Sequence, residues 1–133
     1  MPIATTRLEE GILYTKSTGP GTIAELNDAH REGLHLLQAA GDTGWVLIMD
    51  VSEAGTPSVD MNKDTLRTLI RNQQNDKLAG YVVLGAAQSA RIFLLTYCKL
   101  FRLNMHFEMS FESALIRARA MRDSAKPKDR DTP

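Results

Sequence analysis

Four oxygen-bearing side chains gather where an apolar stretch of the chain ends, and they are the first candidates for chemistry: Asp50, Ser52, Glu53 and Asp60. Ligands of open α/β sheets bind at the carboxyl ends of the strands, so this cluster could form a polar binding site. Polar residues are also the ordinary way to end a strand or to cap the next helix. We favour this structural interpretation of the cluster.

The histidines and the single cysteine do not form a pattern that predicts a metal site. His30 and His35 are five residues apart, so on a helix they point about 140° away from each other and cannot hold one ion together. His106 stands alone, and Cys98 lies in an apolar stretch typical of a buried thiol. We expect no metal and no cofactor. We expect His30 to be a buried, neutral histidine that is hydrogen-bonded to a neighbouring backbone group.

The motifs of common enzyme classes are not found in the sequence. Gly19-Pro20-Gly21 has the wrong spacing for a phosphate-binding loop, and its proline removes an amide donor that such a loop needs. There is no serine nucleophile elbow and no Cys–His pair in a suggestive context. We therefore predict that the protein is not an enzyme. A catalytic pair of carboxylates that folding brings together could not be recognised from the sequence.

Residues 88–103 (QSARIFLLTYCKLFRL) carry more apolar surface than one supporting sheet can cover. On a helix with ~100° per residue, three basic side chains share one narrow arc: Arg91, Lys99 and Arg102. Most of the remaining circumference is apolar, roughly twice the stripe that a helix resting on a sheet needs. The basic arc is typical of a solvated helix side, but it also fits a helix in a membrane interface. We predict a second partner here: another subunit, a regulatory protein, an apolar ligand or a membrane surface.

Length and composition predict one packed domain. The chain has 133 residues, of which 43% are hydrophobic and 24% charged, as in ordinary globular proteins. Sixteen basic residues balance 16 acidic ones, and this zero net charge argues against broad electrostatic binding of nucleic acid. The N-terminus is too polar for a signal peptide, and Lys99 and Arg102 interrupt the best apolar run. We expect a soluble, cytoplasmic protein, with peripheral membrane association left open.

Short apolar segments alternate with amphipathic ones, which predicts an α/β fold with a mostly parallel sheet and an antiparallel first strand at one edge. The expected strands are 3–8, 12–17, 45–49, 81–84 and 105–108, and the expected helices are 22–40, 62–75, 88–103 and 111–121. Thr22 and Glu25 form a capping box at the start of the first helix. We assign 1–122 to a single domain and the polar segment 123–133 to a disordered tail.

This order of elements resembles the STAS-type fold, and more closely the bacterial SpoIIAA-like group that is often described as STAS/SEC14-like. The resemblance covers residues 11–121 and rests on the segments WVLIMDVSEAG, YVVLGAAQSARIFLLTYCKLFRL and MHFEMSFESAL. Within them, a strand ends at Asp50 with Ser52 after it, and a helix begins with Phe111, Ala114 and Leu115. The resemblance implies a mixed, mostly parallel sheet of about five strands, about four helices and no enzymatic activity.

The resemblance also points to a phosphorylation site. Anti-sigma antagonists of this family carry a phosphorylatable serine at the start of the second helix, in an Asp-Ser-Ser-Gly-like signature. This chain has PSVDMNKDT there, and Ser58 is the nearest hydroxyl. Because the acidic-serine-glycine context is missing, we expect Ser58 to be a loop or capping residue, with phosphorylation as the alternative.

Two functions remain open at this stage. The first is a non-enzymatic regulatory module that binds a partner protein, or a second copy in a dimer, through residues 88–103. The second is a SEC14-like binder of a lipid or small apolar ligand, which the resemblance also implies. For both, the candidate contact residues are Phe93, Tyr97, Leu100 and Phe101, with Arg91, Lys99 and Arg102 at the rim.

Overall fold

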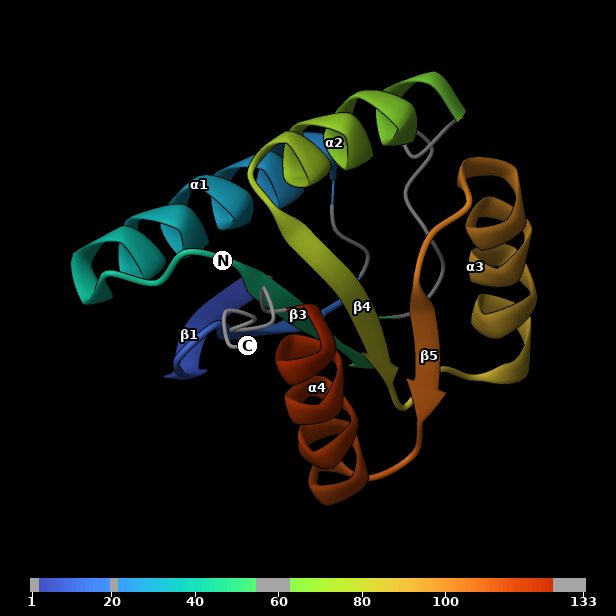
Figure 1. The fold of residues 1–133 in the computed structure, drawn as a ribbon. Coiled ribbons are helices and arrows are strands. Elements are labelled where there is room, and N and C mark those ends of the chain that lie inside the picture. Colours follow the sequence, from blue (N-terminus) through green and yellow to red (C-terminus); the bar gives the residue numbers. More distant parts are fainter. Residues whose placement is uncertain (1–2, 20–21, 55–62, 126–133) are drawn as a thin grey trace.

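Strands and helices alternate along the chain after an initial hairpin (Figure 1). The structure is a computed structural model, and it describes residues 3–19, 22–54 and 63–125. In chain order the elements are β1 (Ile3–Glu9), β2 (Ile12–Thr18), α1 (Ile23–Ala40), β3 (Trp45–Glu53), α2 (Lys63–Asn75), β4 (Leu78–Leu84), α3 (Gln88–Phe101), β5 (Met105–Glu108) and α4 (Phe111–Ala125).

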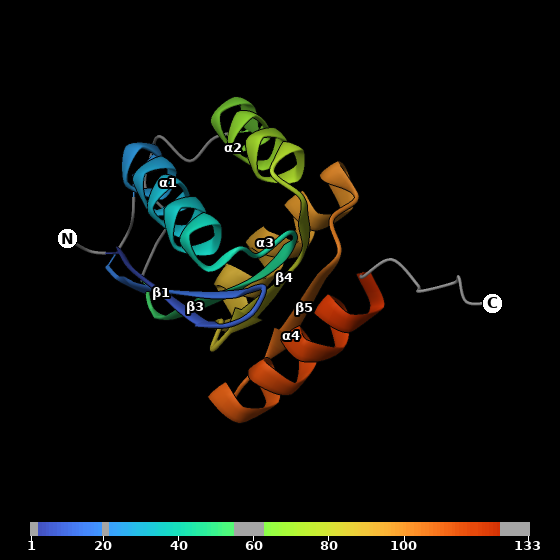
Figure 2. The same cartoon turned by 60° about the vertical axis from the view of Figure 1, so that its left-hand side comes forward.

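The sheet has the strand order β1-β2-β3-β4-β5, with β1 antiparallel to β2 and the other pairs parallel. The three crossovers through α1, α2 and α3 all step in the same direction across the sheet. Right-handed crossovers that step in one direction must place their helices on one face. Accordingly, α1, α2 and α3 cover one face and α4 covers the other (Figures 1 and 2). The predicted mixed, mostly parallel sheet is confirmed.

Two hydrophobic cores lie on the two faces of this sheet. On one face, Ala114, Ala118 and Met121 of α4 pack against a layer of strand residues that includes Ile48 and Val82. On the other face, a second core joins α1 to the sheet through Leu13, Leu37, Trp45, Leu47 and Tyr81. We call the first the α4 face. We call the second the cavity face, because a cavity lies between it and its helices.

The predicted start of α1 is confirmed in detail. The Thr22 hydroxyl accepts a hydrogen bond from the Glu25 amide at 3.1 Å, and the Glu25 carboxylate accepts one from the Thr22 amide at 2.8 Å. Further along α1, Gly33 lies over β2, where an added Cβ would come within 2.5 Å of the Leu13 side chain. The lack of a side chain at this glycine therefore allows α1 to approach the sheet closely.

Four predicted boundaries differ from the observed ones by two residues or more. Strand β3 continues to Glu53 and does not end at residue 49, and β4 begins at Leu78 and not at residue 81. Helix α3 ends at Phe101 rather than at Leu103, because Arg102 takes the left-handed conformation (φ 55°, ψ 51°) and its turn closes the helix. Leu103 then turns back to pack against the core of the cavity face. Helix α4 continues to Ala125, so residues 123–125 belong to it and not to the tail. The rest of the predicted tail, 126–133, lies outside the described residues.

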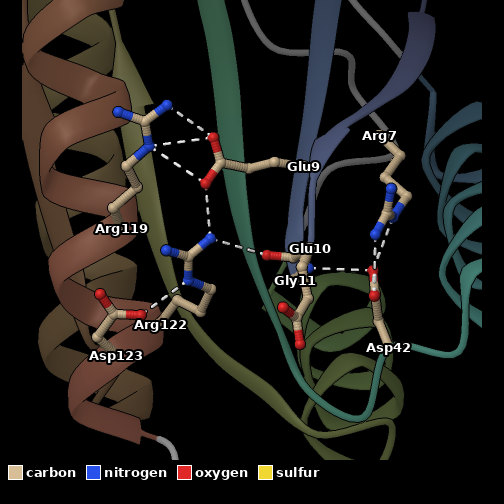
Figure 3. Close-up of polar contacts among 8 residues, drawn as sticks. All are labelled: Arg7, Glu9, Glu10, Gly11, Asp42, Arg119, Arg122 and Asp123. Carbon is tan, nitrogen blue, oxygen red and sulfur yellow. Dashed lines mark hydrogen bonds and ion pairs between the residues drawn. The ribbon is translucent and has the colours of Figure 1, made fainter.

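Ion pairs anchor the β1–β2 turn to α4 (Figure 3). The carboxylate of Glu9 accepts hydrogen bonds from Arg119 Nη2 at 2.7 Å and from Arg122 Nη1 at 2.6 Å. These two guanidinium groups hold the pKa of Glu9 below its ordinary value. Arg122 also donates to the backbone carbonyl of Glu10 at 3.0 Å, so it contacts both the end of β1 and the turn that follows.

The same turn is anchored to the end of α1 from the other side. Asp42, just after α1, accepts hydrogen bonds from Arg7 Nε at 2.8 Å, from Arg7 Nη2 at 3.0 Å and from the Gly11 amide at 3.0 Å (Figure 3). The guanidinium of Arg7 lowers the pKa of Asp42, and the Gly11 amide adds to this effect. The hairpin is thus held between α1 and α4.

Candidate functional site

A cavity of about 180 Å³ lies between the sheet and the three helices of the cavity face. Its walls are mainly apolar. The helices contribute Leu26, Ala29, Leu69, Ile70, Phe93 and Tyr97, among others, and the strands contribute Leu13, Leu47 and Met49. Ligand sites in proteins are typically concave and mostly apolar, with a few polar groups that orient the ligand. We therefore treat this cavity as the candidate site.

Helix α3 faces the cavity with a row of aromatic rings. The ring centroids of Phe93 and Tyr97 are 4.8 Å apart, and those of Tyr97 and Phe101 are 5.8 Å apart. Phe93 and Tyr97 line the cavity. Phe101 does not line it and instead lies under the guanidinium of Arg67 in α2, 5.8 Å from the ring centroid.

The outer face of α3 carries exposed apolar side chains. Ile92 is 59% exposed, Leu95 38% and Leu100 49%. Of the four predicted contact residues, two line the cavity, while Leu100 and Phe101 do not. Phe101 shares the helix face of Phe93 and Tyr97, but it is the last residue of α3, where its ring stacks on Tyr97 and meets Arg67. Leu100 lies beside that face and is exposed.

The three predicted basic residues are exposed, and apolar side chains are exposed beside them. Arg91, Lys99 and Arg102 are interspersed with the exposed Ile92 and Leu95. The guanidinium of Arg91 also lies 5.0 Å from the ring centroid of Phe107 in β5, which ties the start of α3 to the edge strand. The outer face of α3 is therefore a mixed apolar and basic surface.

His30 is the most notable polar group at the cavity wall, and its side chain is only 7% exposed. Its Nε2 lies 2.8 Å from Asp76 Oδ2, so the expected backbone partner is wrong and a side-chain carboxylate takes its place. The reason is tertiary, since Asp76 follows the end of α2, which packs beside α1. The Nδ1 atom of His30 is buried and has no hydrogen-bond partner among the residues that the structure describes.

Gln73 and Tyr81 provide a second polar pair at the wall. Both side chains are almost fully buried, and the Tyr81 hydroxyl donates to Gln73 Oε1. Burial raises the pKa of Tyr81, so its hydroxyl keeps its proton. Gln73 was not among the predicted site residues, although the sequence holds a signal for it. It occupies the position where the apolar stripe of Leu69 and Ile70 would continue.

Trp45 connects these groups to the loop after α2. Its Nε1 donates to the Asp76 carbonyl at 2.7 Å, and its ring packs against the His30 imidazole with centroids 5.7 Å apart. Asp76 therefore positions both rings, through its side chain on one and its backbone on the other. Trp45 also lines the cavity, so its fluorescence should respond to a molecule that binds there.

The cluster at the end of β3 has a structural role in the described part of the chain. Asp50 is 7% exposed and accepts hydrogen bonds from the Tyr14 hydroxyl at 2.5 Å, from Ser52 Oγ at 2.7 Å and from the Ser52 amide at 3.1 Å. Burial and this carboxylate raise the pKa of Tyr14 to about 12. Burial alone would raise the pKa of Asp50 as well, but the three hydrogen bonds outweigh it and lower the pKa.

The remaining members of the predicted polar cluster add no site to this end of the sheet. Glu53 is ion-paired with Lys16 at 3.1 Å. Asp60 and the proposed phosphorylation site Ser58 lie outside the described residues. Within the described ranges, no group of three or more His, Cys, Asp or Glu side chains is placed to hold a metal ion, and no helix is long and apolar enough to cross a membrane.

Comparison with known proteins identifies the fold. No protein-family model and no curated protein sequence matches the chain. An uncharacterised DUF3478-family protein with a SpoIIAA-like fold from Shewanella loihica PV-4 superimposes with a TM-score of 0.61 at 16% identity, over 87% of this chain and 91% of that one. A serine-to-glutamate variant of RsbS from Moorella thermoacetica superimposes with a TM-score of 0.56 at 17% identity, over 95% and 100%. At these identities the likeness shows the fold alone, and it confirms the predicted SpoIIAA-like α/β architecture.

Proposed function

We propose that this protein is a non-catalytic binding module that holds a small apolar molecule in the cavity beneath α3. The observation that supports this function is an apolar cavity of about 180 Å³ inside a domain whose other face is tightly packed. The cavity is partly open, and its apolar lining atoms lack protein partners on the side that faces the empty space. A ligand that fills the space restores those contacts.

The size of the cavity limits the ligand. An engineered cavity of about 150 Å³ with similar aliphatic and aromatic walls in another protein stays dry and binds benzene. The present cavity is comparable in volume, so we expect it to accept a single six-membered ring or a short acyl chain. A whole membrane lipid is too large for this volume. Only one acyl chain of such a lipid could enter the cavity.

Benzene is therefore a suitable probe for this proposal. Titration into the purified protein, followed by Trp45 fluorescence and by NMR shifts of lining methyl groups, should show saturable binding at one site. The cavity-filling variant Ala29→Leu, which replaces a lining residue, should abolish this binding. The variant Ile92→Ser on the outer face of α3 should bind benzene like the wild-type protein. Absence of saturable binding in a folded wild-type protein would contradict the proposal.

A second candidate function is favoured by the outer face of α3. Ile92 and Leu95 lie three residues apart on α3 and are exposed side by side, and exposed apolar groups of this kind often mark an interface. The fold is shared with RsbS, which supports a regulatory module that acts through a protein contact. We propose that a second copy of the chain covers this surface, since a symmetric dimer is the commonest way to cover such a face.

Sedimentation velocity over a range of protein concentrations tests this second function. The wild-type protein should show a concentration-dependent dimer that Ile92→Ser disrupts. Ile116→Ser is the matched control, because Ile116 is 61% exposed but lies on α4. A strict monomer at high concentration would contradict the dimer. If the monomer instead co-sediments with anionic vesicles, and Ile92→Ser co-sediments less, the surface of α3 binds a membrane and not a second copy.

A further inference from the structure

We infer that the cavity holds an unbranched alkyl chain with one small polar head group, and that the head lies at the carboxyl end of β2 and β3. The inference rests on the proposed function, because it needs a small apolar molecule in the cavity. It adds a shape and a direction to that molecule, which the volume of the cavity alone does not specify.

The first step is the length of the cavity. Strand β3 lines it with four side chains that alternate along the strand: Trp45, Leu47, Met49 and Val51. At ~3.3 Å per residue, these four positions span about 20 Å. A rounded space of about 180 Å³ would be no wider than the ~7 Å between two successive side chains on one face of a strand. The cavity is therefore long and narrow along β3.

The second step is the form of the cavity at the amino end of the strands. There it also reaches Tyr81 of β4 and Met105 of β5, which lie in one row with Leu47. The space thus extends across the sheet at this end as well as along it. A flexible alkyl chain can bend to follow a narrow space of this form, whereas a branched or bulky group cannot. The volume has room for about six methylene groups, since a methylene group is close in size to a water molecule, ~30 Å³.

The third step is the change of burial along the cavity. Along β3, Leu47 is 6% exposed but Val51 is half-buried, and along β2, Leu13 is 1% exposed but Ser17 is half-buried. The hydroxyl side chains of Thr15 and Ser17 line the half-buried end. A polar head group keeps its hydrogen bonds only where water or protein polar groups can reach it. The head therefore lies at this end, and the chain extends toward the buried end.

The polar side chains near the buried end do not favour the opposite direction. The Tyr81 hydroxyl donates to Gln73 Oε1, and His30 Nε2 lies 2.8 Å from Asp76 Oδ2. A head group at that end would have to compete with these two contacts within the protein and would lose its water. At the other end it keeps both water and the two hydroxyl groups.

Hexan-1-ol and its branched isomer 3,3-dimethylbutan-1-ol form the matched pair that tests the shape, because they contain the same atoms and the same head group. Dissociation constants are measured by Trp45 fluorescence and NMR. Hexan-1-ol should bind about tenfold more tightly, because the bulky end of the isomer overfills a narrow space. From butan-1-ol to hexan-1-ol, each added methylene should tighten binding about fourfold. This gain should fall off between hexan-1-ol and decan-1-ol, once the cavity is full.

Intermolecular NOEs of bound hexan-1-ol test the direction. Its terminal methyl group should show NOEs to the methyl groups of Leu47, and the protons next to its hydroxyl should show NOEs to Val51. The double variant Thr15→Val/Ser17→Ala removes both hydroxyls and should weaken hexan-1-ol several-fold while benzene affinity stays unchanged. Thr18→Val is the matched control, because Thr18 is exposed and does not line the cavity.

These outcomes separate the inference from the proposed function. A preference for hexan-1-ol no larger than the ratio of the octanol–water partition coefficients of the two isomers would overturn the shape. NOEs in the reverse order, or hexan-1-ol affinity that the double variant leaves unchanged, would overturn the direction. If benzene still binds at one site in those cases, the proposed function stands. Failure of the folded wild-type protein to bind benzene and every alcohol would remove both proposals.

Discussion

The two faces of the sheet are covered in different ways. On the α4 face, Ala114 and Ala118 are fully buried, and their small size lets one helix lie directly on Val46, Ile48 and Val82, which are also 0% exposed. On the cavity face, large side chains from three helices meet over the sheet and leave a space of about 180 Å³. One face is closely packed, and the other face contains a cavity.

The topology explains why the space is on this face. Helix α4 follows the last strand and can settle over the middle of the sheet. The crossover helices must instead share the opposite face, and α3 connects β4 to the short edge strand β5. Helix α3 is tied near its ends by cation–π contacts, of Arg91 with Phe107 and of Arg67 with Phe101. The rings between these two contacts rest beside the cavity.

The largest expected effect compares neighbouring residues of β3 that point to opposite faces. Ile48→Ala on the α4 face should lower the free energy of unfolding by about 3–5 kcal/mol, because it opens a new void in a filled core. Leu47→Ala on the cavity face should cost about 1 kcal/mol less, since Leu47 already borders empty space. Urea unfolding measures both values.

Benzene sharpens this comparison. The Leu47→Ala variant should regain stability when benzene is added, whereas Ile48→Ala should not gain more than the wild-type protein does. Equal losses in the two variants, together with equal responses to benzene, would mean that the faces do not differ in packing.

The comparison also shows what the sequence could reveal. Strands and helices were predictable because local patterns determine them: the buried run of β3, the capping box of Thr22 and Glu25, and the helical period of α4. Gly33, which lies on the inner face of α1 by its helical spacing, allows a close contact with Leu13 of β2. These features depend on residues a few positions apart.

The site depended on contacts that the sequence does not reveal. His30 and Asp76 are 46 residues apart, so the partner of the buried imidazole could not be inferred from its neighbours. Leu100 is 49% exposed, because only part of the apolar circumference of α3 meets the core, and the sequence does not tell which part. What the sequence did signal was excess apolar surface on α3, and the structure divides that surface between the cavity and the outer face.

The next effect concerns the anchor on the cavity-face side of the β1–β2 turn. Asp42→Asn should lower the free energy of unfolding near neutral pH by about 1–2 kcal/mol, because it weakens the hydrogen bonds to Arg7 and Gly11. The folded-state pKa of Asp42 is lowered, so its contribution is present above the unfolded pKa and is lost as the pH falls through the folded pKa. The difference between wild type and variant should therefore shrink in acid.

A matched control for this effect lies in the anchor on the α4 side. Asp123 is 60% exposed and pairs with Arg122 at 2.9 Å, so Asp123→Asn should change stability little at any pH. A pH-independent loss in Asp42→Asn, measured by urea unfolding across the acid range, would show that the charge of Asp42 is not what stabilises the turn.

A smaller effect is expected at the ends of α3. Arg67→Gln and Arg91→Gln each remove one cation–π contact, worth about 0.5 kcal/mol at an exposed site. Because α3 has few other ties to the sheet, the loss should appear as amide hydrogen exchange about twice as fast within α3. Exchange in α4 should stay unchanged. Faster exchange spread evenly over both helices would indicate global destabilisation and not a weakened α3.

The smallest effect on stability comes from two isoleucines with nearly the same exposure on opposite faces. Ile92 on α3 is 59% exposed and Ile116 on α4 is 61% exposed, so replacing either by serine removes little buried surface. Both changes should alter the free energy of unfolding by less than about 0.5 kcal/mol. If Ile92→Ser nevertheless reduces self-association while Ile116→Ser does not, the apolar surface of α3 serves binding and not folding. A stability loss confined to Ile92→Ser would instead make that side chain part of the packing that holds α3 over the cavity.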